Sequence, residues 1–141
     1  MNDAPPARHN DSRPFEVQPA KVEHVHEHEH VLLDHERLDC YQAALELQGL
    51  LPELGRRCGH SLKDQLDRAA ASVLLNLAEG CGRPQRRDRA RFYGIARGSA
   101  METAAIVDIL TIRQMAPLVP CRQAKSLLFR IVSMLTKLQG R

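Results

Sequence analysis

Apolar residues recur with helical spacing along most of the chain after residue 36. From residue 61 to residue 80 they fall at steps of three and four, so they share one side of a helix that Ser61 can cap and Gly80 can end. This stripe comprises Leu62, Leu66, Ala69, Ala70, Val73 and Leu77. Leu75 lies nearly opposite the stripe, and a helix that is apolar on two sides needs two neighbours. We interpret Leu75 as a contact between subunits.

The segment 92–112 shows the same doubling. One stripe comprises Phe92, Ala96, Ser99, Thr103, Ile106 and Leu110, and another, about half a turn away, comprises Gly94, Gly98, Met101, Ala105, Ile109 and Ile112. The second stripe begins with small residues four apart, a spacing that lets another helix backbone approach closely. With Leu75, we therefore assign Gly94, Gly98, Met101, Ala105 and Ile109 to a homo-oligomer interface.

Two further helices complete the predicted fold. The first should begin near Glu36, with Asp34 as its cap. The third ends before Pro117, because a residue that precedes proline is displaced from the helical region. Pro120 then opens a fourth helix, whose single apolar stripe is typical of a peripheral position. Four helices with short links predict an all-α fold, an antiparallel up-down-up-down four-helix bundle.

The two parts of the chain carry opposite charge. Residues 1–36 hold 3 basic and 8 acidic side chains, a net charge of −5, whereas the following 105 residues hold 17 basic and 9 acidic ones, a net charge of +8. A proline-rich acidic segment with few large apolar residues cannot offset its ordering entropy. We expect residues 1–35 to form a disordered tail and residues 36–141 to form the four-helix domain.

Four histidines in this tail alternate with other residues: His24, His26, His28 and His30. In a helix they would form two i,i+4 pairs able to bind a divalent ion, and in a strand all four would share one face. The sequence enforces neither geometry, so we favour a solvated tail without bound metal. A tail whose charge responds to pH is a further alternative.

The remaining composition excludes several classes of protein. The four cysteines lack metal-ligand or redox spacing, and we interpret them as buried or half-buried thiols: Cys40, Cys58, Cys81 and Cys121. No apolar run is long enough to span a membrane, and no signal peptide is evident, so we expect a cytoplasmic protein. No acid/base pair, activated nucleophile or phosphate loop is present, and we expect neither an enzyme nor a cofactor.

Polar residues interrupt the apolar flanks of the second and third helices. They are Ser72, Asn76, Glu79, Ser99 and Glu102. They could line a binding pocket, with Arg68 and Arg97 forming ion pairs with the carboxylates. We favour interhelical hydrogen bonds that fix the register, because an unpaired buried polar group costs about 1–3 kcal/mol.

An arginine cluster precedes and begins the third helix. Six arginines fall within fifteen residues, opposed by Asp88 alone: Arg83, Arg86, Arg87, Arg89, Arg91 and Arg97. The helix macrodipole disfavours cations at an N-terminus, so a solvated helix start does not account for them. Pairing with acids of a neighbouring subunit is one explanation. Because guanidinium groups suit phosphates, we assign Arg83, Arg86, Arg87, Arg89 and Arg91 to a basic belt that binds nucleic acid.

The segments RAAASVLLNLAEGCGR and RFYGIARGSAMET resemble the bacterial four helix bundle protein family. This family includes proteins encoded in intervening sequences of large ribosomal RNA genes, and a distant branch contains the accessory variability proteins of diversity-generating retroelements. The match covers roughly residues 37–139. The resemblance implies an antiparallel four-helix subunit, a ring-shaped homo-oligomer, specifically a pentamer, with basic surfaces that bind nucleic acid, and no catalytic residues. Three features depart from the family's pattern. One is Pro52, at a position where the family's first helix usually continues. The other two are the arginine-rich segment 87–91 and the first 36 residues.

Two functions remain open from the sequence. The first is a homo-oligomeric accessory protein that binds RNA or DNA by charge through residues 83–91. The second is a scaffold whose oligomer displays acidic, histidine-rich tails to a protein partner or a divalent metal ion. The acidic tail could also compete with nucleic acid for the basic belt of its own chain.

Overall fold

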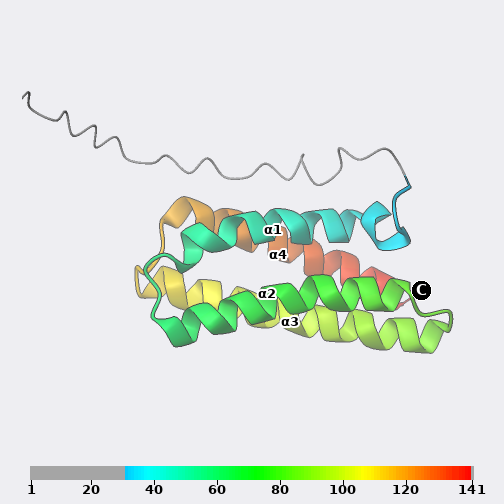
Figure 1. The fold of residues 1–141 in the computed structure, drawn as a ribbon. Coiled ribbons are helices and arrows are strands. Elements are labelled where there is room, and N and C mark those ends of the chain that lie inside the picture. The colour runs from blue at the N-terminus through cyan, green and yellow to red at the C-terminus, as the bar shows by residue number, and fades with distance from the viewer. Residues whose placement is uncertain (1–30, 141) are drawn as a thin grey trace, which may run out of the picture.

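The computed structural model describes residues 31–140 (Figure 1). Within this range the chain forms a short 3-10 helix, η2 (Asp34–Arg37), four α-helices and no strand. The α-helices are α1 (Asp39–Gly55), α2 (His60–Cys81), α3 (Arg86–Ile112) and α4 (Leu118–Gln139). The predicted all-α fold with four helices is confirmed. The predicted tail, apart from its last five residues, lies outside the described range, and so do its four alternating histidines.

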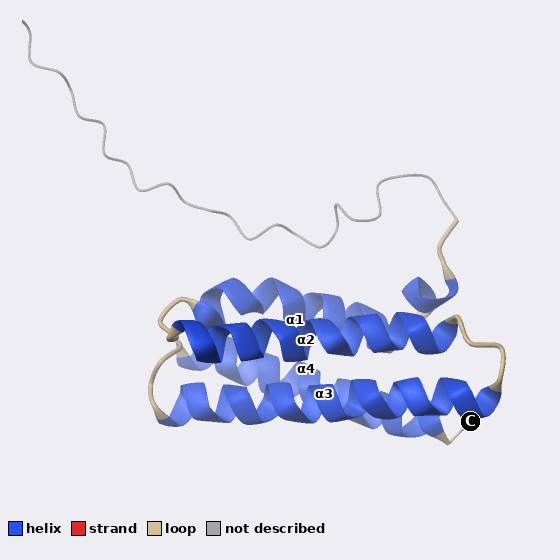
Figure 2. Cartoon of the chain, turned by 60° about the horizontal axis from the view of Figure 1, so that its bottom comes forward, coloured by secondary structure: helices blue, strands red, loops and turns tan. Residues whose placement is uncertain are grey.

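Helices that are adjacent in the sequence also pack side by side. Short turns join α1 to α2, α2 to α3 and α3 to α4, and α1 packs against α4 (Figures 1 and 2). At this last contact the Cys40 thiol lies 3.8 Å from the backbone carbonyl of Ile131. The four helices therefore enclose one shared core.

The core is aliphatic, as a chain without tryptophan requires. Its largest fully buried side chains include Leu47, Leu54, Leu66, Leu77, Leu110, Leu128, Ile131 and Leu135. The predicted stripe of α2 is buried, except that Leu62 is half-buried. On α3 the predicted stripe needs one correction, because Tyr93 is buried at the first core position whereas Phe92 is half-buried.

The start of the bundle differs from the sequence prediction. α1 begins at Asp39 rather than near Glu36, and its N-cap is Leu38, which has an extended backbone and makes no side-chain cap. Asp34 instead opens η2, and the Glu36 carboxylate accepts a hydrogen bond from the Leu33 amide at 2.7 Å. The acidic residues that resemble a cap for α1 therefore organise a separate turn before it. Pro52 lies inside α1, which continues through it.

The ends of α2 also differ from the prediction. Its N-cap is Gly59, so Ser61 lies inside the first turn, and the helix continues past Gly80 to Cys81. Gly80 is buried, and a Cβ at this position would lie 2.7 Å from Cε1 of Tyr93. The absence of a side chain at Gly80 therefore allows α3 to pack closely on α2, and the glycine does not serve to end the helix.

Candidate nucleic-acid interface

One end of the bundle brings together the last residues of α2 and α4 and the first residues of α3. The Arg86 guanidinium donates a hydrogen bond to the backbone carbonyl of Gly140, just beyond α4, at 3.1 Å. Helix C-termini present unpaired carbonyls with partial negative charge. Arg86, in the first turn of α3, therefore lies at the negative end of α4, which offsets the unfavourable dipole of its own helix.

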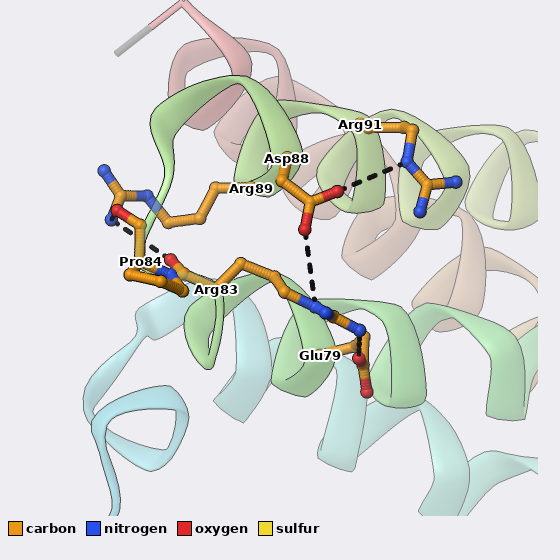
Figure 3. Close-up of polar contacts among 6 residues, drawn as sticks. All are labelled: Glu79, Arg83, Pro84, Asp88, Arg89 and Arg91. Carbon is orange, nitrogen blue, oxygen red and sulfur yellow. Dashed lines mark hydrogen bonds and ion pairs between the residues drawn. The ribbon is translucent and has the colours of Figure 1, made fainter.

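Arg83 is held within the subunit (Figure 3). Its guanidinium forms an ion pair with Glu79 and lies 3.6 Å from a carboxylate oxygen of Asp88. The same group lies 4.9 Å from the centre of the Phe92 ring, within the range of a cation–π interaction. Arg83 therefore links the end of α2 to the first turns of α3.

Arg89 is also engaged within the subunit. Its Nη1 lies 3.4 Å from the carbonyl oxygens of both Arg83 and Pro84, so it donates to the turn between α2 and α3 (Figure 3). These carbonyls have no helical partner, and a guanidinium can satisfy two of them at once. Arg83 and Arg89 thus stabilise the turn that precedes Arg86, Arg87 and Arg91 of α3.

The other three predicted arginines have exposed side chains, although Arg86 also donates to the Gly140 carbonyl. Arg86, Arg87 and Arg91 are exposed, and Arg87 makes no hydrogen bond or ion pair with any described residue. Arg91 lies 3.5 Å from Asp88 and 4.5 Å from the centre of the Phe92 ring, with its side chain 63% exposed. An exposed ion pair of this length contributes little free energy, so Arg91 can exchange Asp88 for another anion.

The charge at this end is unbalanced. Of the described residues, only two carboxylates, Glu79 and Asp88, lie within 4.0 Å of the arginines of the cluster. The five arginines proposed as contacts are Arg83, Arg86, Arg87, Arg89 and Arg91. Three of the five, Arg86, Arg87 and Arg89, therefore have no carboxylate of residues 31–140 within 4.0 Å, and this surface can attract polyanions.

Phe92 has a position that the sequence analysis missed. The guanidinium groups of Arg83 and Arg91 both lie over its ring, at 4.9 Å and 4.5 Å from the ring centre. The sequence contained a signal for this contact, because Arg91 is adjacent to Phe92 and an arginine beside an aromatic ring commonly forms a cation–π pair. The ring therefore contacts both arginines by cation–π interactions.

The predicted interhelical polar residues separate into two groups. Ser72 of α2 and Ser99 of α3 lie 2.8 Å apart through their hydroxyl oxygens, and Asn76 donates to the Ser72 hydroxyl at 3.0 Å. Glu79 lies apart from this network and pairs with Arg83, and Glu102 is exposed on the rim of a polar groove of about 420 Å³.

The expected cationic partners of these carboxylates bind elsewhere. Arg68 pairs with Asp64 on its own helix at 2.7 Å, and Arg97 donates to the Thr136 hydroxyl of α4 at 3.0 Å. The expectation that Arg68 and Arg97 would answer Glu79 and Glu102 is therefore wrong. Glu79 pairs instead with Arg83, which lies one helical turn further along the chain at i+4.

The residues assigned to an oligomer interface lie mostly on the surface. Leu75, Met101 and Ile109 are 70%, 52% and 36% exposed, and Gly98 and Ala105 are also exposed. Gly94 differs, because a Cβ there would lie 2.8 Å from Nε2 of Gln139 on α4. A larger residue here would have to displace the end of the flexible Gln139 side chain.

A thiol and a phenol of the core are held in their protonated forms. Burial raises the pKa of the Cys40 thiol from 9.0 to about 12, and burial together with the Cys81 hydrogen bond raises the pKa of Tyr93. Neither group ionises near neutral pH. Within residues 31–140, no three potential ligands among histidine, cysteine and acidic side chains gather as a metal site. No helix in that range is sufficiently long and apolar to cross a bilayer.

Comparison with known proteins identifies the family. None of the curated proteins matches the chain. A family model described as 23S rRNA-intervening sequence protein matches residues 36–137, which is more than half of the chain and includes nearly all of the four α-helices. The chain therefore belongs to the 23S rRNA-intervening sequence protein family.

Proposed function

We propose that this protein is a non-enzymatic accessory protein that binds RNA or DNA by charge. The binding surface consists of the exposed side chains of Arg86, Arg87 and Arg91 at the start of α3, of which Arg86 would exchange its bond to the Gly140 carbonyl for a phosphate. The observation that carries the proposal is the local excess of arginines over carboxylates at this end of the bundle. The family's name, which refers to intervening sequences of 23S rRNA, agrees with a nucleic-acid partner.

Arg83 and Arg89 have a supporting role in this proposal. Arg83 pairs with Glu79 of α2 and Asp88 of α3, and Arg89 donates to two carbonyls of the α2–α3 turn, so in this proposal they hold the first turn of α3 in place and do not contact phosphate. The phosphate contacts proposed for Arg86, Arg87 and Arg91 would fix the position of the protein on nucleic acid and carry no sequence information. We therefore expect affinity that depends strongly on salt and weakly on sequence.

The proposal includes an antiparallel arrangement of the four helices and the assembly of subunits into a ring-like homo-oligomer. By resemblance to the family, this ring is a pentamer. Exposed apolar side chains on α2 and α3 support it, among them Leu75, Met101 and Ile112, the last 82% exposed. A ring would repeat the arginines of each subunit and so present several phosphate sites to one polyanion. We place the protein in the cytoplasm, where nucleic acid is present and thiols remain reduced.

The test compares two matched pairs of arginines. Arg86→Glu/Arg87→Glu reverses the proposed site, and Arg56→Glu/Arg57→Glu makes the same charge change at the turn between α1 and α2, at the other end of the bundle (Figure 1). Fluorescence anisotropy would follow labelled single-stranded RNA, structured RNA and duplex DNA at several salt concentrations. For the unmodified protein we expect a log–log slope of about −3 or steeper.

The two variants should behave differently. Reversing Arg86 and Arg87 should make the slope shallower by about 1.4 to 1.8 and strongly weaken binding, because two phosphate contacts are lost. The Arg56/Arg57 variant should retain most of its affinity. Equal losses in both variants would show that net charge, and not this site, controls binding. If the unmodified protein bound none of the three probes at low salt, the proposed function would be wrong.

A further inference from the structure

The outward face of α4 is basic along its whole length. It carries Arg122, Lys125, Arg130 and Lys137, all exposed, and α4 contains no aspartate or glutamate. Lys125 is paired with Asp108 of α3 at 2.8 Å. The other three cations have no carboxylate of a described residue within 4.0 Å. This face is therefore a second cationic surface, separate from the arginines at the start of α3.

A phenyl ring lies in the middle of this cationic face. Phe129 is 76% exposed, although its neighbours Leu128 and Ile131 are buried. At about 100° per residue, Phe129 lies within about 40° of Arg122 and Lys125 around the helix axis. The packing of the subunit does not explain an exposed aromatic ring at this position. Unlike Phe92, Phe129 has no guanidinium of residues 31–140 over its ring.

We propose that the outward face of α4 binds single-stranded nucleic acid, with Phe129 stacked on a base and Arg122, Arg130 and Lys137 near the flanking phosphates. Aromatic side chains combined with a basic surface are the usual means by which proteins bind single strands without sequence preference. The bases of a duplex are already stacked on each other and cannot accept the ring. The inference rests on the proposed function and specifies the form of nucleic acid that this face selects.

Charge favours this ligand over a second copy of α4. Two such faces brought together would place like charges opposite each other, which disfavours a symmetric contact. A polyanion, by contrast, satisfies both the cations and the ring. A subunit contact through Phe129 is therefore treated as a competing outcome of the experiment.

The test distinguishes the effect of the aromatic ring of Phe129 from the effect of its hydrophobicity. Phe129→Leu keeps an apolar side chain with high helix propensity and removes the aromatic face, whereas Phe129→Trp keeps that face. The probes are a labelled 12-nucleotide single-stranded RNA that contains one 2-aminopurine and a duplex of the same sequence. Sedimentation would measure the mass of each variant, and circular dichroism would confirm its fold.

We expect Phe129→Leu to weaken single-strand binding by roughly 5- to 150-fold, the range expected for loss of one stacked base. Duplex affinity and assembly mass should stay unchanged. Quenching of 2-aminopurine should disappear in Phe129→Leu and return in Phe129→Trp. Arg122→Gln/Arg130→Gln should make the single-strand salt slope shallower by about 1.4.

Two results would overturn the inference. If Phe129→Leu binds the single strand as tightly as the unmodified protein, the ring does not stack on a base. If Phe129→Leu lowers the assembly mass together with affinity, the ring is a subunit contact. In either case, loss of binding in the Arg86/Arg87 variant would leave the proposed function standing, so the two failures can be distinguished.

Discussion

Replacement of Gly80 by alanine tests how closely α2 and α3 pack. An added Cβ would lie 2.7 Å from Cε1 and 2.9 Å from Cδ1 of Tyr93. The ring has little room to move, because Tyr93 is 5% exposed and its hydroxyl lies 3.4 Å from the Cys81 thiol. Overpacking of this kind typically costs about 1–3 kcal/mol. Alanine in a helix gains about 1 kcal/mol over glycine, so we expect a net loss of stability of about 1 kcal/mol.

The matched control is Gly49→Ala in α1. No atom would lie within 4 Å of the new Cβ, so this variant should gain up to about 1 kcal/mol. The same substitution should therefore change stability in opposite directions at the two sites, with a difference of about 2 kcal/mol. Urea denaturation followed by circular dichroism at one fixed protein concentration would measure both values, since assembly makes stability concentration-dependent. A Gly80→Ala protein at least as stable as the unmodified chain would refute the close packing described here.

Three further predictions concern the thiol, the exposed glycine and the hydroxyl pair. Because the pKa of Cys40 is raised from 9.0 to about 12, the folded state keeps a proton that the unfolded state releases, so stability is retained below pH 9 and lost between pH 9 and 12. The Cys40 share of this loss is at most about 1.4 kcal/mol per pH unit, and a Cys40→Ala protein whose denaturation midpoint falls just as steeply would contradict it. Gly98→Ala should not destabilise the subunit, since nothing lies within 4 Å of the new Cβ, but light scattering should detect a lower mass if a neighbouring helix packs there. Ser99→Ala should cost about 1 kcal/mol in urea denaturation by removing the partner of Ser72, and unaltered stability would show that the bond contributes nothing.

The helical period made much of the fold predictable. The stripe from Leu66 to Leu77 is buried, and Leu75, on the opposite side, is exposed. Both follow from the angle between successive residues, which is nearly constant in a helix. The helix starts were less predictable, because the N-caps of α1 and α2 are Leu38 and Gly59, which make no side-chain cap. Their position depends on how the chain enters the bundle.

The partners of the arginines could not be predicted from local spacing. Arg86 bonds to Gly140, 54 residues away, so this contact exists only after α3 and α4 have packed. The exposure of Phe129, by contrast, could have been predicted. Three consecutive apolar residues, ending in Phe129, span about 200° of a helix and cannot all face one core. The same reasoning that identified Leu75 applies to it.

The short turns between successive helices also have a kinetic consequence. Most packing partners in this bundle are close in sequence, and contacts of this kind form early because little loop entropy is lost. The exception is the contact of α1 with α4, where Cys40 meets Ile131 across 91 residues. We therefore expect the pair α2 and α3 to form a folding nucleus, and the docking of the first helix onto the last to complete folding. The two terminal helices should then be the first to separate when the protein unfolds.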